Sequence, residues 1–304
     1  MSLPLGFSPV GLLTFVLLTF AICTTVNTFA MEAAVLFTPA FLFVYPKLVP
    51  AFPDLALQGA IGLALFVELF GYTSSVTAYW FRGQVNWDIA KSILVVSVPI
   101  AIGARAVSYF VPSSALKLLF GGMLLVLSGI LYGAHRDGKS LTDWVSDTRF
   151  EELLPNGSDA VRTDGGTPTT QFDRFDRVIA GVGGAMAGLV GIAIGELAQT
   201  LLTVRKKVSI RLSTGTSALV LHGTIVSALA ANLVLLRYAP ASFSGHDFTV
   251  PFGFGLVAGV TCIGGGQMGA LLNSRVPEDR TIQTMIVAYS LVGVFTLFRV
   301  FVLG

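Results

Sequence analysis

Ten runs of mainly hydrophobic residues dominate the pattern of this chain. They lack the alternation of apolar and polar positions that a membrane β-strand shows, and several reach about 20 residues, the length at which a helix spans a bilayer. The pattern therefore predicts an all-α integral membrane protein with about eight to ten transmembrane or re-entrant helices. The runs cover residues 9–30, 32–46, 56–80, 88–110, 114–134, 178–194, 196–204, 211–236, 250–273 and 281–303.

The composition supports this class and argues against a soluble protein. Hydrophobic residues make up 54% of the 304 positions and charged residues 12%, whereas charged residues make up about a quarter of a soluble domain. The basic run 205–207 then belongs to a membrane boundary and not to a nucleic-acid interface. We expect the lipid bilayer to surround the chain and no nucleic acid to bind it. The sequence does not define the oligomeric state.

Motifs for the common catalytic and metal chemistries are absent from the sequence. The chain has no Walker loop GxxxxGK[ST], no HExxH and no GxSxG. Its two cysteines, Cys23 and Cys262, are too far apart along the chain for a disulfide framework or a metal motif. We therefore expect no enzyme activity, no cofactor and no bound metal.

A single long polar stretch, residues 135–177, divides the chain. It holds nine of the seventeen acidic residues and is rich in Gly, Pro, Ser and Thr, which is typical of a solvated linker or a small amphipathic appendage. We expect an N-terminal membrane repeat at 1–134 and a C-terminal membrane repeat at 178–304, each with five hydrophobic runs.

The two halves resemble each other in the order and spacing of short motifs. MEAAVLFTP in the first half aligns with GELAQTLLT in the second, which places Glu32 over Glu196. Because each half has an odd number of runs, the second copy must enter the membrane from the opposite side, and the result is an inverted repeat. The runs 32–46 and 196–204 are short for a full crossing, so we expect broken helices that meet near the bilayer midplane.

The basic residues of the short loops predict the orientation. One side carries Arg82, the cluster at 205–211 and the six basic residues of the linker region, while the other side has mainly Lys47, Lys117 and Arg237. Basic loops remain in the cytoplasm. We expect a multi-pass plasma-membrane protein with a cytoplasmic linker and with both termini outside.

Three acidic residues lie within apolar runs. Glu32 and Glu196 each precede a short run, where a carboxylate can cap a broken helix, carry a proton or hold a cation. Glu68 lies in the body of the run 56–80, and an ionised carboxylate there must face the bundle interior, find a partner or take up a proton. Arg105 on the next run is an available partner, so Glu68 has either a structural or a transport role.

Glycines and hydroxyl groups form a second set of candidates. The run CIGGGQMGALL permits close helix packing, and it also permits unwinding that points backbone N–H groups into a cavity. The hydroxyls of STGTSALV can cap or back-bond the helix, and they can also bind an anion without carrying charge. As substrate-binding candidates we take Gly195, Thr214, Thr216, Ser217, Gly264, Gly265, Gly266 and Gln267.

These motifs occur in an order that resembles a known family. GLVGIAIGELAQTLL is followed by STGTSALV and then by CIGGGQMGALLNSRVPEDRTIQTM, while ELFGYTSSVTAYWFRGQVNWDIAKSIL lies in the first half. This order is similar to that of the sulfite exporter TauE/SafE family, the TSUP transporters. The resemblance implies export of sulfite, sulfonates or related small sulfur-containing or organic anions, with proton coupling as an option. The GGG motif is displaced here to 264–266, so the resemblance does not define the anion.

The features together predict a secondary transporter of small anions that works by alternating access. A channel-like pore is the alternative within membrane transport. A third hypothesis is a membrane-embedded enzyme that pairs an acid with His222, the histidine within the run 211–236. A membrane histidine can instead hydrogen-bond a backbone carbonyl or a hydroxyl group.

Overall fold

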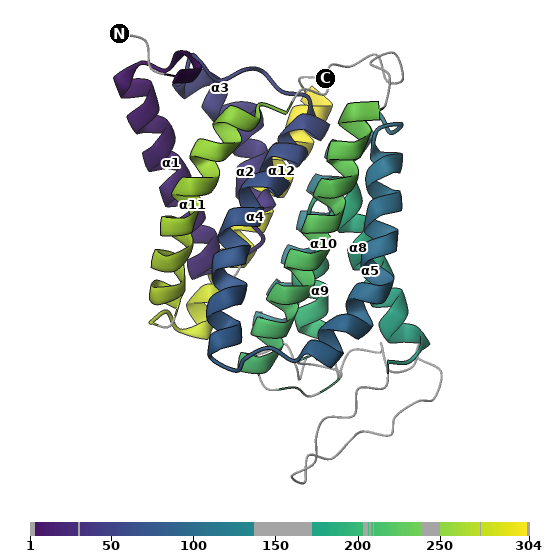
Figure 1. The fold of residues 1–304 in the computed structure, drawn as a ribbon. Helices are drawn as coiled ribbons and strands as arrows, with labels where there is room; N and C mark the ends of the chain where they lie inside the picture. Colours follow the sequence, from purple (N-terminus) through teal and green to yellow (C-terminus); the bar gives the residue numbers. More distant parts are fainter. Residues whose placement is uncertain are drawn as a thin grey trace.

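The computed structural model describes residues 4–29, 31–136, 172–202, 206, 208, 210–238, 250–273 and 275–302. Within this part of the chain the regular structure is entirely helical, and the helices stand side by side in a bundle (Figure 1). The predicted all-α class is confirmed. After the short turn η1 (Pro4–Gly6), the elements are α1 (Pro9–Thr28), α2 (Ala34–Pro39), η2 (Ala40–Val44), α3 (Tyr45–Leu48), α4 (Leu57–Phe81), α5 (Trp87–Ser108), α6 (Ser113–Arg136), α8 (Arg174–Val190), α9 (Ile194–Thr200), α10 (Ile210–Tyr238), α11 (Phe252–Asn273) and α12 (Glu278–Val302).

Six of the described helices are long and apolar enough to cross a membrane. These spans are Pro9–Thr28, Leu57–Phe81, Trp87–Ser108, Ser113–Gly133, Leu212–Leu235 and Asp279–Val302. The shorter apolar stretch Ala34–Leu48 is one continuous rod built from α2, η2 and α3. Its middle is a π-helical turn, because Pro39 and Pro46 lack the N–H groups that a regular α-helix needs there.

The short helices return toward the end of the bundle from which the preceding long helix started. α1 and α3 share the end where both termini lie, whereas α9 points toward the opposite end, where α6 ends and α8 begins (Figure 1). α1 with the α2–α3 rod, and α8 with α9, are therefore two hairpins that enter the bundle from opposite ends. Most of the predicted linker 135–177 lies outside the described residues.

Local sequence sets both ends of α8. Asp173 and Asp176 form a reciprocal capping box, so α8 begins at Arg174 and not at the predicted 178. Gly191 ends the helix with a left-handed backbone, φ 78°, a conformation that glycine adopts without steric cost. The Asp176 carboxylate also binds the Lys206 ammonium at 2.6 Å, which ties the segment after α9 to the start of α8.

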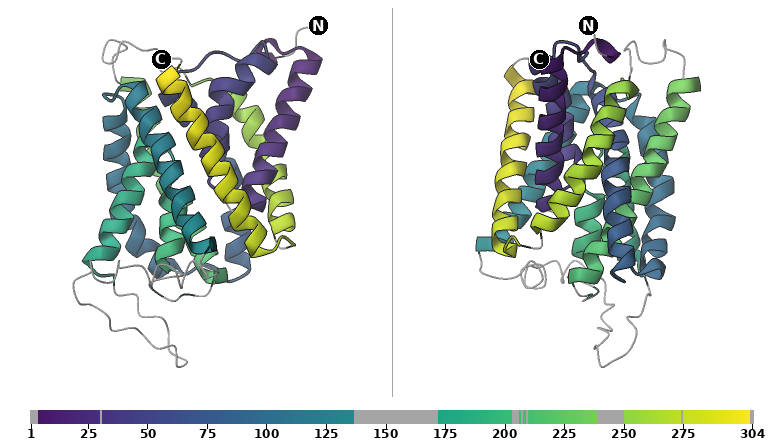
Figure 2. Two further views of the ribbon diagram at one scale, coloured as in Figure 1. Left: turned by 180° about the vertical axis from the view of Figure 1, so that it is seen from behind. Right: turned by 60° about the vertical axis from the view of Figure 1, so that its left-hand side comes forward.

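The two halves pack on each other with a two-fold pattern. The first helix of each half contacts the fourth helix of the other, α1 on α11 and α8 on α5. The third helices contact each other and also the fourth helix of the opposite half, α4 on α11 and α10 on α5. The fifth helices, α6 and α12, lie side by side (Figure 2). This is the pattern that two inverted copies of one module produce.

Glycines allow the first and fourth helices to approach closely. A Cβ atom at Gly184 would lie 2.5 Å from the Ser97 carbonyl oxygen on α5. At the equivalent contact between α11 and α1, a Cβ atom at Gly269 would lie 2.7 Å from the Thr24 carbonyl oxygen on α1. Both contacts have room for backbone only, as in the small-residue interfaces of membrane helices.

Candidate functional site

Glu32 joins the two broken helices inside the bundle. It lies between α1 and α2 and is 2% exposed. Its carboxylate accepts hydrogen bonds from the backbone N–H groups of Gly195, at 2.6 Å, and of Ala193. Both amides belong to the start of α9 in the other half. The acid of the first half therefore caps the broken helix of the second half.

The break between α8 and α9 has a strained backbone that aims these amides at Glu32. Ala193 has φ 85°, a left-handed conformation that is uncommon for residues with a Cβ atom. Such a residue costs about 1–3 kcal/mol and persists only when its surroundings hold it in place. The hydrogen bond from the Ala193 N–H group to Glu32 supplies part of that support.

This strain leads to a prediction for Ala193. Ala193→Val is expected to lower the free energy of unfolding by about 2–3 kcal/mol, because a β-branched side chain is far less compatible with a positive φ. Ala193→Gly should stay within about 1 kcal/mol of the wild type, since relief of strain offsets the lost methyl contacts and the added chain entropy. Thermal unfolding of the purified variants in detergent measures both. Equal stability of the two variants would argue against a strained turn.

Glu196 lies beside Glu32 and completes a cluster of acids. Its Oε1 atom accepts a hydrogen bond of 2.7 Å from the hydroxyl group of Tyr289 on α12, and its other carboxylate oxygen is buried without a hydrogen-bond partner among the described residues. We call Glu32, Glu196 and Tyr289 the carboxyl cluster. The cluster thus places two buried acids at the break between α8 and α9, one bonded to backbone N–H groups and the other to a tyrosine hydroxyl.

Glu68 closes the broken helix of its own half. One carboxylate oxygen accepts from the N–H group of Ala34, the first residue of α2, and the other has no hydrogen-bond partner among the described residues. The predicted alternative of a structural pair with Arg105 is wrong. The guanidinium of Arg105 donates instead to Asn232 and to the Gln58 carbonyl, because Arg105 meets α4 at its first turn, ten residues before Glu68.

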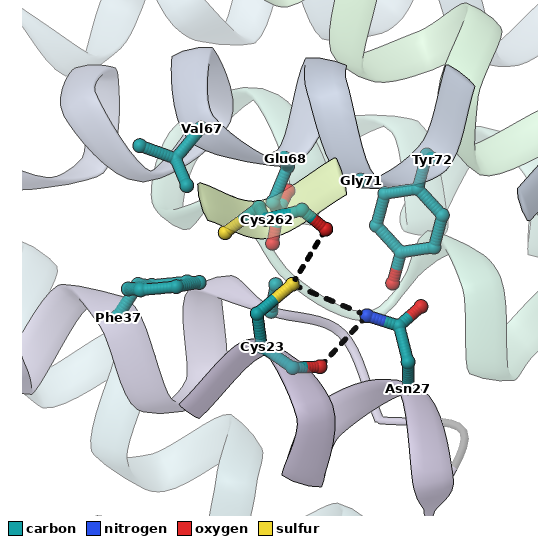
Figure 3. A pocket seen from close by; sticks show the side chains of 9 residues that line it. Cys23, Asn27, Phe37, Val67, Glu68, Gly71, Tyr72 and Cys262 are labelled. Carbon is teal, nitrogen blue, oxygen red and sulfur yellow. Dashed lines mark hydrogen bonds between the residues drawn. The ribbon is translucent and has the colours of Figure 1, made fainter. Parts of the chain in front are cut away.

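A small cavity borders Glu68 (Figure 3). Its volume of about 10 Å³ is close to the minimum that one water molecule needs. Asn27, Cys23 and Cys262 face it from α1 and α11, and Tyr72 faces it from α4. The fold thus brings together two cysteines that are far apart along the chain, and the Cys23 thiol donates to the Cys262 carbonyl oxygen at 3.4 Å.

Of the predicted substrate-binding residues, the structure joins only Gly195 to the carboxyl cluster. Thr214 accepts from Gln199 at 3.3 Å, Thr216 accepts from the Asn86 N–H group at 3.0 Å, and Ser217 donates to the Thr214 carbonyl at 3.0 Å. Two of these contacts fasten other segments to α10: one holds α9, and the other holds the loop that precedes α5. Their role in substrate binding stays a prediction.

The glycine triplet Gly264, Gly265 and Gly266 lies within the continuous helix α11. A Cβ atom at Gly265 would lie 2.9 Å from the Cys23 Cβ atom, so close packing against α1 accounts for this glycine. Gln267 donates to the Ser74 hydroxyl and lines a groove of about 710 Å³ between α4 and α11. The lining of this groove is mainly apolar, and Thr73, Ser74, Thr77 and Gln267 are the polar residues that face it.

Several residues of the site gave no clear signal in the sequence. In the sequence, Ala193 is a small residue within a glycine-rich run and does not stand out. Its positive φ arises from the hairpin between α8 and α9. Tyr289 lies in the apolar run 281–303, where a lone tyrosine could have been noted as a polar group that needs a partner. His222 makes neither of the expected contacts through Nδ1, which has no partner among the described residues.

The fold and the site define a multi-pass helical membrane protein in which two halves meet at broken helices closed by buried acids. The family described as "Sulfite exporter TauE/SafE" matches residues 15–296 of the chain. The chain belongs to this family, and the resemblance noted in the sequence is confirmed. It is a family of membrane transporters for sulfite-type anions. No curated protein and no solved structure matches the chain.

Proposed function

We propose that this protein is a secondary transporter that exports small anions, such as sulfite or a sulfonate, by alternating access. The observation that carries the proposal is the hydrogen bonding of Glu32 to the start of α9 in the other half. Alternating access needs two halves that move against each other around a fixed central site. Glu32 lies where the halves meet and would bridge them in one of the two states.

The carboxyl cluster is our candidate for proton coupling. Glu32 accepts from the N–H group of Gly195, the residue before Glu196, and Glu196 accepts from Tyr289. In our proposal the two acids hold one proton in one state of the transport cycle and none in the other. Loss of that proton places two negative charges side by side in a site of low dielectric constant, where their repulsion is strong. The protonation state therefore favours one arrangement of the halves over the other, which is what coupling requires.

The anion is proposed to enter from the groove between α4 and α11. Gln267, Ser74 and Thr77 offer neutral hydrogen-bonding groups there, and these can hold an anion without the cost of burying a counter-ion. The remaining predicted residues, Gly195, Thr214, Thr216, Ser217 and Gly264–Gly266, are kept as candidates for later steps. We place the linker in the cytoplasm and the protein in the plasma membrane.

Transport of labelled sulfite into proteoliposomes tests the proposed function. We expect flux that responds to an imposed pH gradient and is absent from protein-free liposomes. Glu196→Gln keeps an acceptor for Tyr289 but cannot lose a proton, so its sulfite flux should no longer respond to the pH gradient. Absence of flux for sulfite, sulfonates and small carboxylates with folded wild-type protein would refute the proposal.

A further inference from the structure

Arg105 is a fully buried positive charge whose partners are all neutral. It lies one turn before the end of α5 and is 0% exposed. Its Nε and Nη2 atoms donate to the Asn232 Oδ1 atom at 2.9 and 2.7 Å, and Nη2 also donates to the Gln58 carbonyl oxygen at 2.9 Å. The Tyr109 ring lies 5.6 Å from the guanidinium carbon. In the described part of the chain, no carboxylate pairs with this arginine.

An arginine without a counter-ion is costly inside a membrane protein. Neutral carbonyl groups solvate a guanidinium only in part, and an unpaired buried charge destabilises a protein by several kcal/mol. Ionisable residues in membrane segments are therefore rare and mark sites of function, with a partner expected for each. For Arg105 the protein itself supplies no such partner among the described residues.

The same cluster has more donors than acceptors. The Asn232 Oδ1 atom accepts from Arg105 and also from the Tyr109 hydroxyl group at 2.7 Å, which fixes the orientation of its side-chain amide. The two remaining donor groups, Arg105 Nη1 and Asn232 Nδ2, are buried and have no acceptor in the described structure. A buried donor without a partner loses its hydrogen bonds to water and gains none in return. Both the charge and the spare donors call for an anion.

A glycine lets α4 pack directly against the cluster. A Cβ atom at Gly62 on α4 would lie 2.9 Å from Asn232 Nδ2 and 3.4 Å from Arg105 Nη2. Any larger residue would press on the amide group that lacks an acceptor. The cluster is therefore closed by α4, and a ligand reaches it only when α4 moves against α10.

The position of the cluster has a counterpart at the other end of the bundle. Arg105 and Asn232 join α5 to α10, and this contact corresponds to that of α11 with α4 in the two-fold pattern. At the latter contact Gln267 donates to Ser74, and the groove of about 710 Å³ opens beside them. At one end of the bundle, the neutral pair of Gln267 and Ser74 lies beside an open groove. At the other end, the pair of Arg105 and Asn232 is buried.

We propose that Arg105 and Asn232 form a second anion site, which takes a small oxyanion at the end of the bundle where the termini lie. Arg105 Nη1 and Asn232 Nδ2 would each donate to one oxygen of the ligand, and the guanidinium would supply the counter-charge. This inference rests on the proposed function and adds to it the site through which the anion leaves or enters on that side. Opening of α4 against α10 would admit the ligand.

Asn232→Asp is the sharpest test, because it installs a fixed carboxylate of nearly the same shape beside Arg105. The variant should fold and be at least as stable as the wild type, since the buried charge gains a counter-ion. Sulfite should no longer raise its unfolding temperature at the concentration that stabilises the wild type. In proteoliposomes its KM for sulfite should rise at least tenfold. Arg105→Gln should show the same loss of sulfite stabilisation.

Arg299→Gln is the matched control. Arg299 also lies on a membrane helix near the terminal end, but it stacks on Phe43 and Phe295 outside the proposed site. Its KM for sulfite should equal that of the wild type. Wild-type protein that transports sulfite together with an Asn232→Asp variant of unchanged KM would overturn the second site and leave the proposed function standing. Wild-type protein that neither binds nor transports small anions would overturn both.

Discussion

Glu32→Ala is expected to lower the free energy of unfolding by about 3–5 kcal/mol and to abolish sulfite transport. The substitution leaves the N–H groups of Ala193 and Gly195 without their acceptor in a buried place. Each unpaired buried donor costs about 1–3 kcal/mol, and more when the lost partner was charged. Thermal unfolding in detergent and transport in proteoliposomes measure the two effects.

Glu196→Gln is the control for the loss of stability. The glutamine oxygen can still accept from Tyr289, and no backbone amide in the described contacts depends on Glu196. Its unfolding temperature should therefore remain within a few degrees of the wild type, whatever happens to proton coupling. A Glu32→Ala variant as stable as Glu196→Gln would show that the bridge between the halves contributes little to the fold.

Gly188→Ala is expected to lower the free energy of unfolding by more than about 3 kcal/mol. The added Cβ atom would overlap the Ala101 carbonyl oxygen and lie 2.8 Å from the Ala104 Cβ atom, both on α5. No side-chain rotation relieves a clash with backbone, so α8 and α5 must separate. Size-exclusion profiles and unfolding temperatures of the detergent-purified variant will show the loss.

Gly103→Ala provides the comparison on the same pair of helices. Gly103 is on α5, and a Cβ atom there would have nothing within 4 Å. In the interior of a helix, alanine is more favourable than glycine by about 1 kcal/mol, so this variant should be as stable as the wild type or more stable. If both glycine variants behaved alike, close contact of α5 and α8 would not be the reason for Gly188.

The sequence predicted the helical elements well because their signal is local. Each of the ten hydrophobic runs overlaps one of the described helices or the α2–α3 rod. The short runs 32–46 and 196–204 correspond to the rod and to α9, and their length indicated broken helices but not whether these cross the membrane or turn back. The start of α8 was missed because Arg174 and Arg177 are polar, although the capping box at Asp173 was a readable signal.

Prediction of the site was less complete because contacts between helices decide it. Glu32, Glu68 and Glu196 stood out as acids in apolar surroundings. In the structure the carboxylate of Glu32 caps the start of α9, and that of Glu68 caps the start of α2. Which acid caps which helix depends on the packing of the halves. The pairing of Arg105 with Asn232 has the same origin, since 127 positions separate them along the chain and no local pattern links them.

The capping of α9 by Glu32 from the other half has a consequence for biogenesis. While the ribosome has delivered only the first half, Glu32 has no amide groups to bind and would face the bilayer interior unprotected. The acid can reach its final partners only after residues 193 and 195 have entered the membrane. The first half therefore cannot complete its own polar contacts, and the capping of α9 by Glu32 forms only when both halves are in the membrane.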